Sequence, residues 1–141
     1  MVYADSSCLV AMLVVEPRTD AVIEWLARHS KQPLCTADWC VSEVASALAI
    51  KVRTKQLTQP LADAAWESFE AACDGLLRLV NVESSDFMLA ARLCRVGESG
   101  LRAGDALHLA VACRMKCRAM WSLDQKLNLN ARANGLKVAL A

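Results

Sequence analysis

The chain has little charge of either sign and no long basic tract. Only 22% of its 141 residues are charged, and 16 Lys and Arg against 15 Asp and Glu leave a formal net charge of +1. The missing basic tract argues against histone-like binding of nucleic acid, although a local basic groove is compatible with this balance. The low charge and the apolar fraction of 55% exclude disorder as the main state of the chain. They also favour an apolar surface patch that is covered by a second copy of the chain or by another protein.

Other absences exclude further classes of protein. No apolar run approaches the ~20 residues needed to cross a bilayer, so we expect no contact with a membrane. Asp5 interrupts the first apolar run and no basic region precedes it, so we expect no signal peptide and a cytoplasmic protein. The seven cysteines contain no CxxC pair, and we interpret them as reduced core residues. No GxxxxGK[ST] motif occurs, which argues against a P-loop nucleotide enzyme.

Short apolar runs alternate with longer helical patterns along the chain. Strands separated by helices indicate βαβ units and a parallel sheet. We therefore predict a three-layer α/β/α fold with a central parallel sheet of about five strands, in one domain over residues 1–141. Ser6 and Ser7 are expected to cap the first helix, and Gly75 to end another in the left-handed conformation. The expected strands lie at residues 2–4, 33–36, 77–82, 118–123 and 137–140, and the helices at 8–15, from 19 or 20, 37–53, 60–75, 84–96, 103–115 and 124–133.

Four acidic residues, Asp5, Glu43, Asp105 and Asp124, interrupt apolar stretches. Asp5 and Asp124 follow predicted strands, where parallel sheets place their sites, and the other two lie in first turns of helices. Carboxylates ~4 Å apart repel by ~4 kcal/mol at an effective dielectric of about 20, so a cluster needs protons or a cation. Hard oxygen ligands favour Mg²⁺ or Mn²⁺, which activate water and offset phosphate charge. The pattern therefore predicts a metal-dependent phosphodiesterase.

Each acid also has a purely structural explanation. Asp105 and Asp124 can cap helix N-termini, Asp5 can be a turn acid, and Glu43 can be a solvated helix residue. His108, one turn after Asp105, can approach the substrate, hold Asp105 by a hydrogen bond, or be a satisfied core histidine. We expect the remaining acids to be solvated; they are Glu16, Asp20, Glu24, Asp38, Asp63, Glu67, Glu70, Asp74, Glu83, Asp86 and Glu98.

Basic residues near these motifs also have two interpretations. Arg102 adjoins the turn before Asp105, and Lys51, Arg53 and Lys55 close the long helix. Either set can contact phosphates, but solvated charge is the default interpretation. We expect the four tryptophans to be core or interface residues, with RNA base stacking as a lesser alternative.

Four segments together resemble the motifs of PIN-domain ribonucleases, most closely the VapC toxins of bacterial toxin–antitoxin pairs. Their order and spacing agree over essentially the whole chain, and the segment Gly-Asp-Ala-Leu-His at residues 104–108 is the most specific. Ser122 stands where the family more often has Thr, so a hydroxyl is kept. The segments are VYADSS at 2–7, SEVASAL at 42–48, RAGDALHLA at 102–110 and SLD at 122–124.

This resemblance implies a PIN-like domain with endoribonuclease activity on structured RNA, supported by Mg²⁺ or Mn²⁺. By motif match, Asp5, Glu43, Asp105 and Asp124 would form the acidic metal centre. Three residues would support the substrate: Ser6, Ser122 and Arg102. The resemblance also implies a homodimer and a small antitoxin whose segment covers the acidic cleft, often with a basic side chain reaching the carboxylates.

Two other functions compete with this hypothesis. A PIN-like module that only binds protein or RNA would have a missing or scattered acid set. A phospho-acceptor receiver domain would need an adjacent acidic pair after the first strand, but Asp5 is followed by Ser6 and Ser7.

Overall fold

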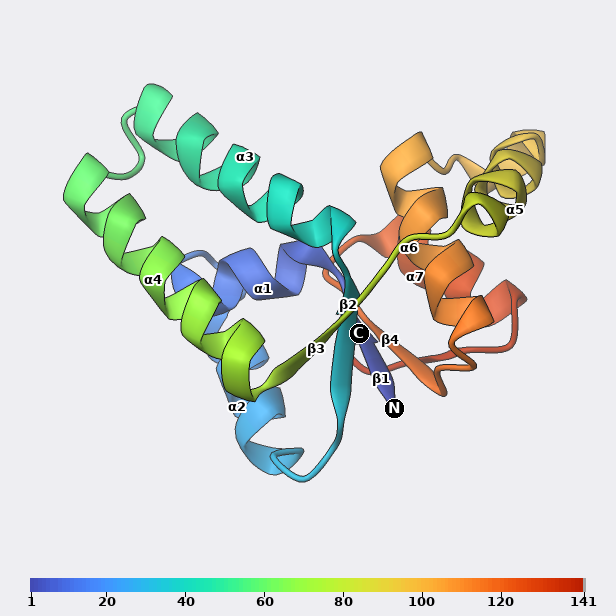
Figure 1. The fold of residues 1–141 in the computed structure, drawn as a ribbon, viewed down its shortest axis with the longest axis horizontal. Coiled ribbons are helices and arrows are strands. Elements are labelled where there is room, and N and C mark those ends of the chain that lie inside the picture. Colours follow the sequence, from blue (N-terminus) through green and yellow to red (C-terminus); the bar gives the residue numbers. More distant parts are fainter. Residues whose placement is uncertain (141) are drawn as a thin grey trace.

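The computed structural model describes residues 1–140 and contains a five-stranded, all-parallel sheet (Figure 1). The strand order is β3-β2-β1-β4-β5, so the first strand lies at the centre of the sheet. Each neighbouring pair of strands is parallel, which confirms the predicted parallel sheet. The strands are β1 (Val2–Ala4), β2 (Leu34–Ala37), β3 (Leu77–Val80), β4 (Ala119–Trp121) and β5 (Lys137–Val138).

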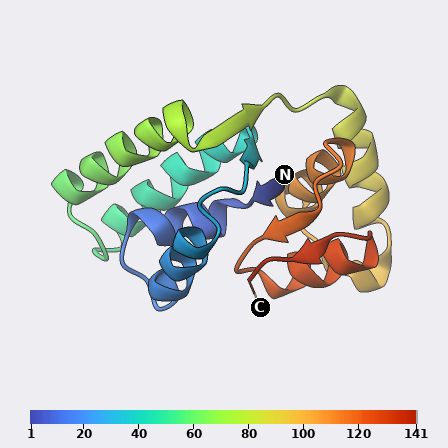
Figure 2. The same cartoon turned by 90° about the horizontal axis from the view of Figure 1, so that it is seen from below.

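Helices cover both faces of the sheet, which confirms the three-layer α/β/α fold. Helices α1 to α4 lie on one side, and α5 to α7 lie on the other (Figures 1 and 2). The helices are α1 (Ser6–Leu13), α2 (Thr19–Arg28), α3 (Trp39–Arg53), α4 (Gln59–Gly75), α5 (Ser84–Cys94), α6 (Ala103–Arg114) and α7 (Gln125–Ala133), with a short 3-10 turn, η1 (Gly97–Ser99). Within residues 1–140, no helix combines the length and the apolar character that a membrane span requires.

Strand β1 shows how the sequence builds two cores. Successive side chains of a strand point to opposite faces, so Val2 and Ala4 join the core under α1 to α4, and Tyr3 joins the core under α5 to α7. All three residues are at most 2% exposed. A strand buried on both faces reads as a continuous apolar run, which is why β1 could be recognised from so few residues.

Several predicted helix ends and strand ends were wrong in detail. Asp5, not Ser6 or Ser7, caps α1, because its side chain accepts a hydrogen bond from the Ser7 N–H. Gly75 belongs to α4 and is not left-handed; the positive-φ glycines in the described part of the chain are Gly100 and Gly135. The strands predicted over 77–82, 118–123 and 137–140 are shorter than expected, because pairing with the neighbouring strand ends before the apolar run does.

Asp86 was expected to be solvated, but its side chain is buried and only 1% exposed. One carboxylate oxygen accepts a hydrogen bond from Arg114 Nε at 2.8 Å, and the other accepts from the backbone N–H of Glu83 at 2.8 Å. Arg114 also donates to the backbone carbonyl of Asn81 at 2.8 Å. A buried carboxylate needs such partners, and these link α5 to the last turn of α6.

Candidate functional site

Asp5 is held at the carboxyl end of the central strand and is 4% exposed. Its Oδ2 accepts hydrogen bonds from Ser7 Oγ at 2.5 Å and from Ser122 Oγ at 2.7 Å. Its Oδ1 lies 3.4 Å from Ser6 Oγ and 3.6 Å from His108 Nε2. One oxygen therefore anchors the side chain, and the other faces the neighbouring polar groups.

The hydroxyls that hold Asp5 also join two turns that are far apart in the sequence. Ser7 Oγ accepts a hydrogen bond from the Leu123 N–H at 2.9 Å, and Ser122 Oγ accepts from the Asp124 N–H at 3.0 Å. The turn after β1 is thereby fastened to the turn after β4. From the sequence Ser7 was expected only to cap a helix, and this support of Asp5 was not predicted; the place of Ser7 beside Asp5 and Ser6 was the available signal.

Glu43 and His108 meet beside Asp5. The Nε2 of His108 is hydrogen-bonded to Glu43 Oε2, which brings α6 and α3 together. The other ring nitrogen, Nδ1, lies 2.8 Å from the hydroxyl of Tyr3, which also accepts a hydrogen bond from the Ala37 N–H at 3.1 Å. His108 is 1% exposed and is both a satisfied core histidine and a member of the site. Its ring nitrogens bond to Tyr3 and Glu43, so the alternative in which His108 holds Asp105 by a hydrogen bond is not the one that the structure shows.

The direction of each pKa shift shows which neighbours act on these groups. Burial alone would lower the pKa of His108, but the hydrogen bond to Glu43 and the charge of Asp5 raise it above its ordinary value. Burial would raise the pKa of Glu43, and the hydrogen bond and charge of His108 outweigh it and lower that pKa. Burial raises the pKa of Asp105, and the negative charges of Asp124 and Asp5 raise it further. Negative charge thus accumulates at this edge of the sheet.

Asp105 and Asp124 have the helix-capping contacts that their structural explanation predicted. Asp105 Oδ2 accepts a hydrogen bond from the Arg102 N–H at 3.3 Å, and Asp124 Oδ1 accepts from the Leu127 N–H at 2.8 Å. Both side chains are half-buried, whereas Arg102 is exposed. Each cap uses one carboxylate oxygen, so the second oxygen is available to another partner.

Asp5, Glu43 and His108 form the group that can hold a metal ion. Each offers one ligand atom, and these atoms lie within 4.8 Å of one another. Oxygen ligands lie about 2.0–2.6 Å from Mg²⁺ or Ca²⁺, so one ion can sit among atoms at this separation. Because His108 Nε2 is hydrogen-bonded to Glu43, the two carboxylates are the groups that fit a divalent cation, and His108 lies beside them as the partner of Glu43. Asp105 and Asp124 lie outside this tight group, although their charges act on each other.

Gly104 allows Glu43 to approach the start of α6. A Cβ on this residue would lie 3.3 Å from Glu43 Oε1 and 3.7 Å from Trp39 Nε1. Gly104 lies in the first turn of α6, inside the helix expected over residues 103–115. Because Gly104 has no side chain, α3 and α6 can approach each other closely at this point.

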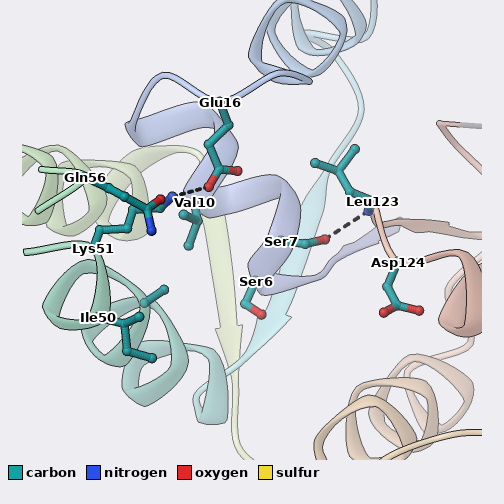
Figure 3. Close-up of a pocket in the computed structure, with 10 residues that line it drawn as sticks. Ser6, Ser7, Val10, Glu16, Ile50, Lys51, Gln56, Leu123 and Asp124 are labelled. Atoms are coloured by element: carbon teal, nitrogen blue, oxygen red, sulfur yellow. Dashed lines mark hydrogen bonds and ion pairs between the residues drawn. The ribbon is translucent and has the colours of Figure 1, made fainter. Parts of the chain in front are cut away.

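A groove of about 540 Å³ opens beside the acidic residues (Figure 3). Ser6, Ser7 and Asp124 lie at one end of it, and Glu16 and Lys51 lie at the other. The groove thus extends from the carboxylates along the space between α1 and α3.

Comparisons with known proteins agree with this architecture. The VapC20 toxin of Mycobacterium tuberculosis, described as cleaving the sarcin-ricin loop, shares 17% identity, with a TM-score of 0.72 over 92% of this chain and 95% of that chain. FitAcB from Neisseria gonorrhoeae shares 16% identity, with a TM-score of 0.74 over 98% and 96% of the two chains. VapBC2 from Rickettsia felis, bound to a promoter DNA fragment, shares 11% identity, with a TM-score of 0.68 over 98% and 97%. At these identities the likeness shows the fold alone.

A search of curated protein sequences found no match. The family profile described as PIN domain matches residues 2–133, which is nearly the whole chain. The chain therefore belongs to the PIN domain family.

Proposed function

We propose that this chain is a metal-dependent endoribonuclease of the VapC toxin type, which cuts structured RNA and is neutralised by a cognate antitoxin. The observation that carries the proposal is the group of ligand atoms from Asp5, Glu43 and His108 within 4.8 Å of one another. The descriptions of similar folds support it, since one is a VapC toxin described as cleaving the sarcin-ricin loop and another is VapBC2 bound to a fragment of promoter DNA. In this proposal residues 1–141 act as one PIN-like domain.

Mg²⁺ or Mn²⁺ would be held by Asp5 and Glu43, with Asp105 and Asp124 adding negative charge beside them. Such an ion, when bound, activates water and offsets negative charge on phosphate oxygens. Ser7 and Ser122 keep Asp5 Oδ1 directed at the cluster by holding the other oxygen. His108 orients the Glu43 carboxylate, because its own ring is fixed by the hydroxyl of Tyr3.

Substrate contacts are assigned to residues around these carboxylates. The Ser6 hydroxyl lies between Asp5 and the groove. The guanidinium of Arg102 belongs to an exposed residue at the start of α6, where it can meet a phosphate. Ser122 acts indirectly, through its hydrogen bond to Asp5. We propose attack by water in line with the P–O3′ bond, which forms the new P–O bond, breaks P–O3′ and leaves a 5′-phosphate and, after protonation of the leaving oxygen, a 3′-hydroxyl.

The antitoxin and a second copy of the chain are the proposed protein partners, in the cytoplasm. Exposed apolar side chains support a covered surface: Phe87 is 57% exposed, Met88 is 63% exposed and Trp39 is 40% exposed. Phe87 and Trp39 line an apolar groove of about 470 Å³ that α3, α5 and α6 share. Hydrophobic patches of this kind commonly mark interaction sites.

Cleavage of an end-labelled RNA hairpin tests the proposal. The purified chain should cut it with Mg²⁺ or Mn²⁺ and not with EDTA, and mass spectrometry of the products should show 5′-phosphates. Asp5→Asn and Asp105→Asn should abolish cleavage, whereas Asp63→Asn, an exposed acid on α4, should not. Full activity of Asp5→Asn at saturating Mg²⁺ would contradict the proposal. RNA binding without cleavage in any of these metals would favour the non-catalytic binding module.

A further inference from the structure

Lys51 and Glu16 form an ion pair in the wall of the groove. Lys51 Nζ lies 2.5 Å from Glu16 Oε1, and the two side chains are only 17% and 25% exposed. Lysine is normally among the most exposed residues, and both were expected to be solvated. The pair joins α3 to the segment that follows α1, and Figure 3 shows it at the end of the groove away from Asp124.

Lys51 lies on the same side of α3 as Glu43. Residues four apart share a face of a helix, so Glu43, Ala47 and Lys51 form one row. Eight residues span about 12 Å along the helix axis, which places the ammonium group and the metal-binding carboxylate at two ends of the row. Ala47 lies between them and also lines the groove, where its small side chain leaves space. Lys51 lines one end of the groove and Asp124 the other, so an RNA strand lying in it would contact the ammonium group and lead toward the acidic residues.

We propose that Lys51 is a positioning residue for RNA: its ammonium group contacts a phosphate of the strand that leads to the carboxylates, and Glu16 competes with that phosphate for Lys51. This inference rests on the proposed ribonuclease function. In the structure Glu16 occupies the position beside Lys51 Nζ that a phosphate oxygen would take. A phosphate carries the same sign of charge as the carboxylate, so it can replace Glu16 as the partner of the ammonium group.

Competition of this kind favours polymers over single nucleotides. Glu16 is covalently attached, so its effective concentration beside Lys51 is high and an isolated phosphate displaces it poorly. A strand already held at the acidic end of the groove presents its next phosphates at a high effective concentration as well. Only such a strand gains the Lys51 contact. The ion pair thereby restricts the groove to substrates that reach both ends.

The apolar residues of the groove do not distinguish between RNA and a peptide as the molecule that binds there. Val10, Ile50 and Leu123 line it, and a peptide could lie against them. The observation that favours RNA is the lysine, whose charge is complementary to phosphate and whose place on α3 is in line with the metal-binding Glu43.

Equilibrium binding separates this role from a purely structural one. We would measure the fluorescence anisotropy of a 5′-fluorescein single-stranded RNA oligonucleotide in Mg²⁺, with every variant in an Asp105→Asn background that leaves the RNA intact. Lys51→Gln should weaken binding about fivefold, and the slope of log affinity against log salt should fall by about 0.7, the value for one lost phosphate contact on a single strand. Glu16→Gln should strengthen binding about threefold, because it frees Lys51.

Further variants sharpen the test. Arg53→Gln removes one exposed positive charge from the same helix outside the groove, and it should leave affinity and slope near the background values. Glu16→Gln combined with Lys51→Gln should bind as weakly as Lys51→Gln alone, since Glu16 acts through Lys51. Lys51→Arg retains the charge and should keep most of the affinity. Lys51→Met removes the charge but keeps an apolar side chain of similar length, and it replaces Lys51→Gln if that variant fails to fold.

A structural staple would give a different pattern. Both single variants break the same ion pair, so a staple predicts equal changes of affinity in the same direction. The proposal would be overturned by such equal changes, or by unchanged affinity in both single variants. It would also be overturned if the Asp105→Asn chain showed no measurable RNA binding. Cleavage by the unmodified chain is measured separately. If the two variants change RNA affinity in opposite directions but the unmodified chain cuts no RNA, the RNA-binding groove is supported and the ribonuclease function is rejected. If the chain cuts RNA but the affinities do not change in opposite directions, only the role of Lys51 is rejected.

Discussion

Replacing Asp5 by Asn tests the metal site without relying on catalysis. Asn has the same shape, and its amide oxygen can accept the hydrogen bonds that Ser7 and Ser122 donate to Asp5 Oδ2. The amide nitrogen then takes the place of Oδ1, which faces His108 and belongs to the ligand group. The substitution therefore removes one ligand oxygen and one charge while it preserves the anchoring contacts.

The expected magnitude follows from linkage between binding and folding. An ion that binds only the folded chain stabilises it by about 2.7 kcal/mol at 100 times its Kd. For a chain of 141 residues, each kcal/mol corresponds to about 3–5 °C, so Mn²⁺ should raise the Tm by about 10 °C. Asp5 supplies one of the two carboxylates assigned to the ion and is the more buried of the two, so Asp5→Asn should reduce the shift to less than about 2 °C.

The assay is thermal unfolding followed by circular dichroism over a titration of MnCl₂. Each variant is compared with its own metal-free sample, so any change in intrinsic stability cancels. Asp63→Asn, an exposed acid on α4, is the matched control and should retain the full shift. An equal Mn²⁺ shift in the Asp5→Asn chain would refute the assignment of Asp5 as a ligand.

Three further predictions concern the groups around Asp5. Tyr3→Phe leaves the Ala37 N–H and His108 Nδ1 without their partner and should lower the urea unfolding free energy by about 2 kcal/mol; a loss below about 0.5 kcal/mol would contradict this role. Gly104→Ala should leave urea stability unchanged or higher, because Ala favours a helix, yet it should reduce the Mn²⁺ shift by displacing Glu43; an undiminished shift would reject the close approach. The folded-state pKa of His108 is raised above its ordinary value of 6.5, so its stabilising effect on the metal-free chain is fully present below about pH 6.5 and is lost as the pH rises through the folded pKa. Urea unfolding across this range should show a steeper fall for the unmodified chain than for His108→Gln, and parallel profiles would contradict the assigned interaction.

The parallel sheet and its layers were predictable because they depend on local patterns. Short apolar runs between longer helical patterns required βαβ units, and the structure has them. The strand ends were harder to predict, because pairing with a neighbouring strand decides where a strand stops. Residues 81 and 82 continue the apolar pattern of β3 only partly, and the Val82 N–H bonds to the side chain of Asp38 instead of a strand.

The structure places the four acids of the predicted site in two different settings. Asp5 and Glu43 do lie together, although the case for Glu43 rested on helix facing alone. Asp105 and Asp124 lie outside the tight group and cap helices. The role of His108 could not be chosen from sequence, since its alternatives depended on which neighbours the fold would bring to its ring.

Asp86 shows the same limit away from the site. On sequence it is an acid in the first turn of a helix, where solvation is the normal state. The structure buries it because Arg114, 28 residues later, donates a hydrogen bond to it. Contacts at this separation leave no periodic signal in a single sequence.

The sequence by itself determined the α/β class, the order of strands and helices, and the placement of four acids where helices and strands begin or end. These properties follow from apolar spacing and from local backbone preferences, which act over a few residues. Tertiary structure decided that Ser122 holds Asp5, that His108 joins Glu43, and that Lys51 is paired with Glu16 in a groove. Such contacts join residues 35 to 117 positions apart, and only packing of the whole chain determines which of them form.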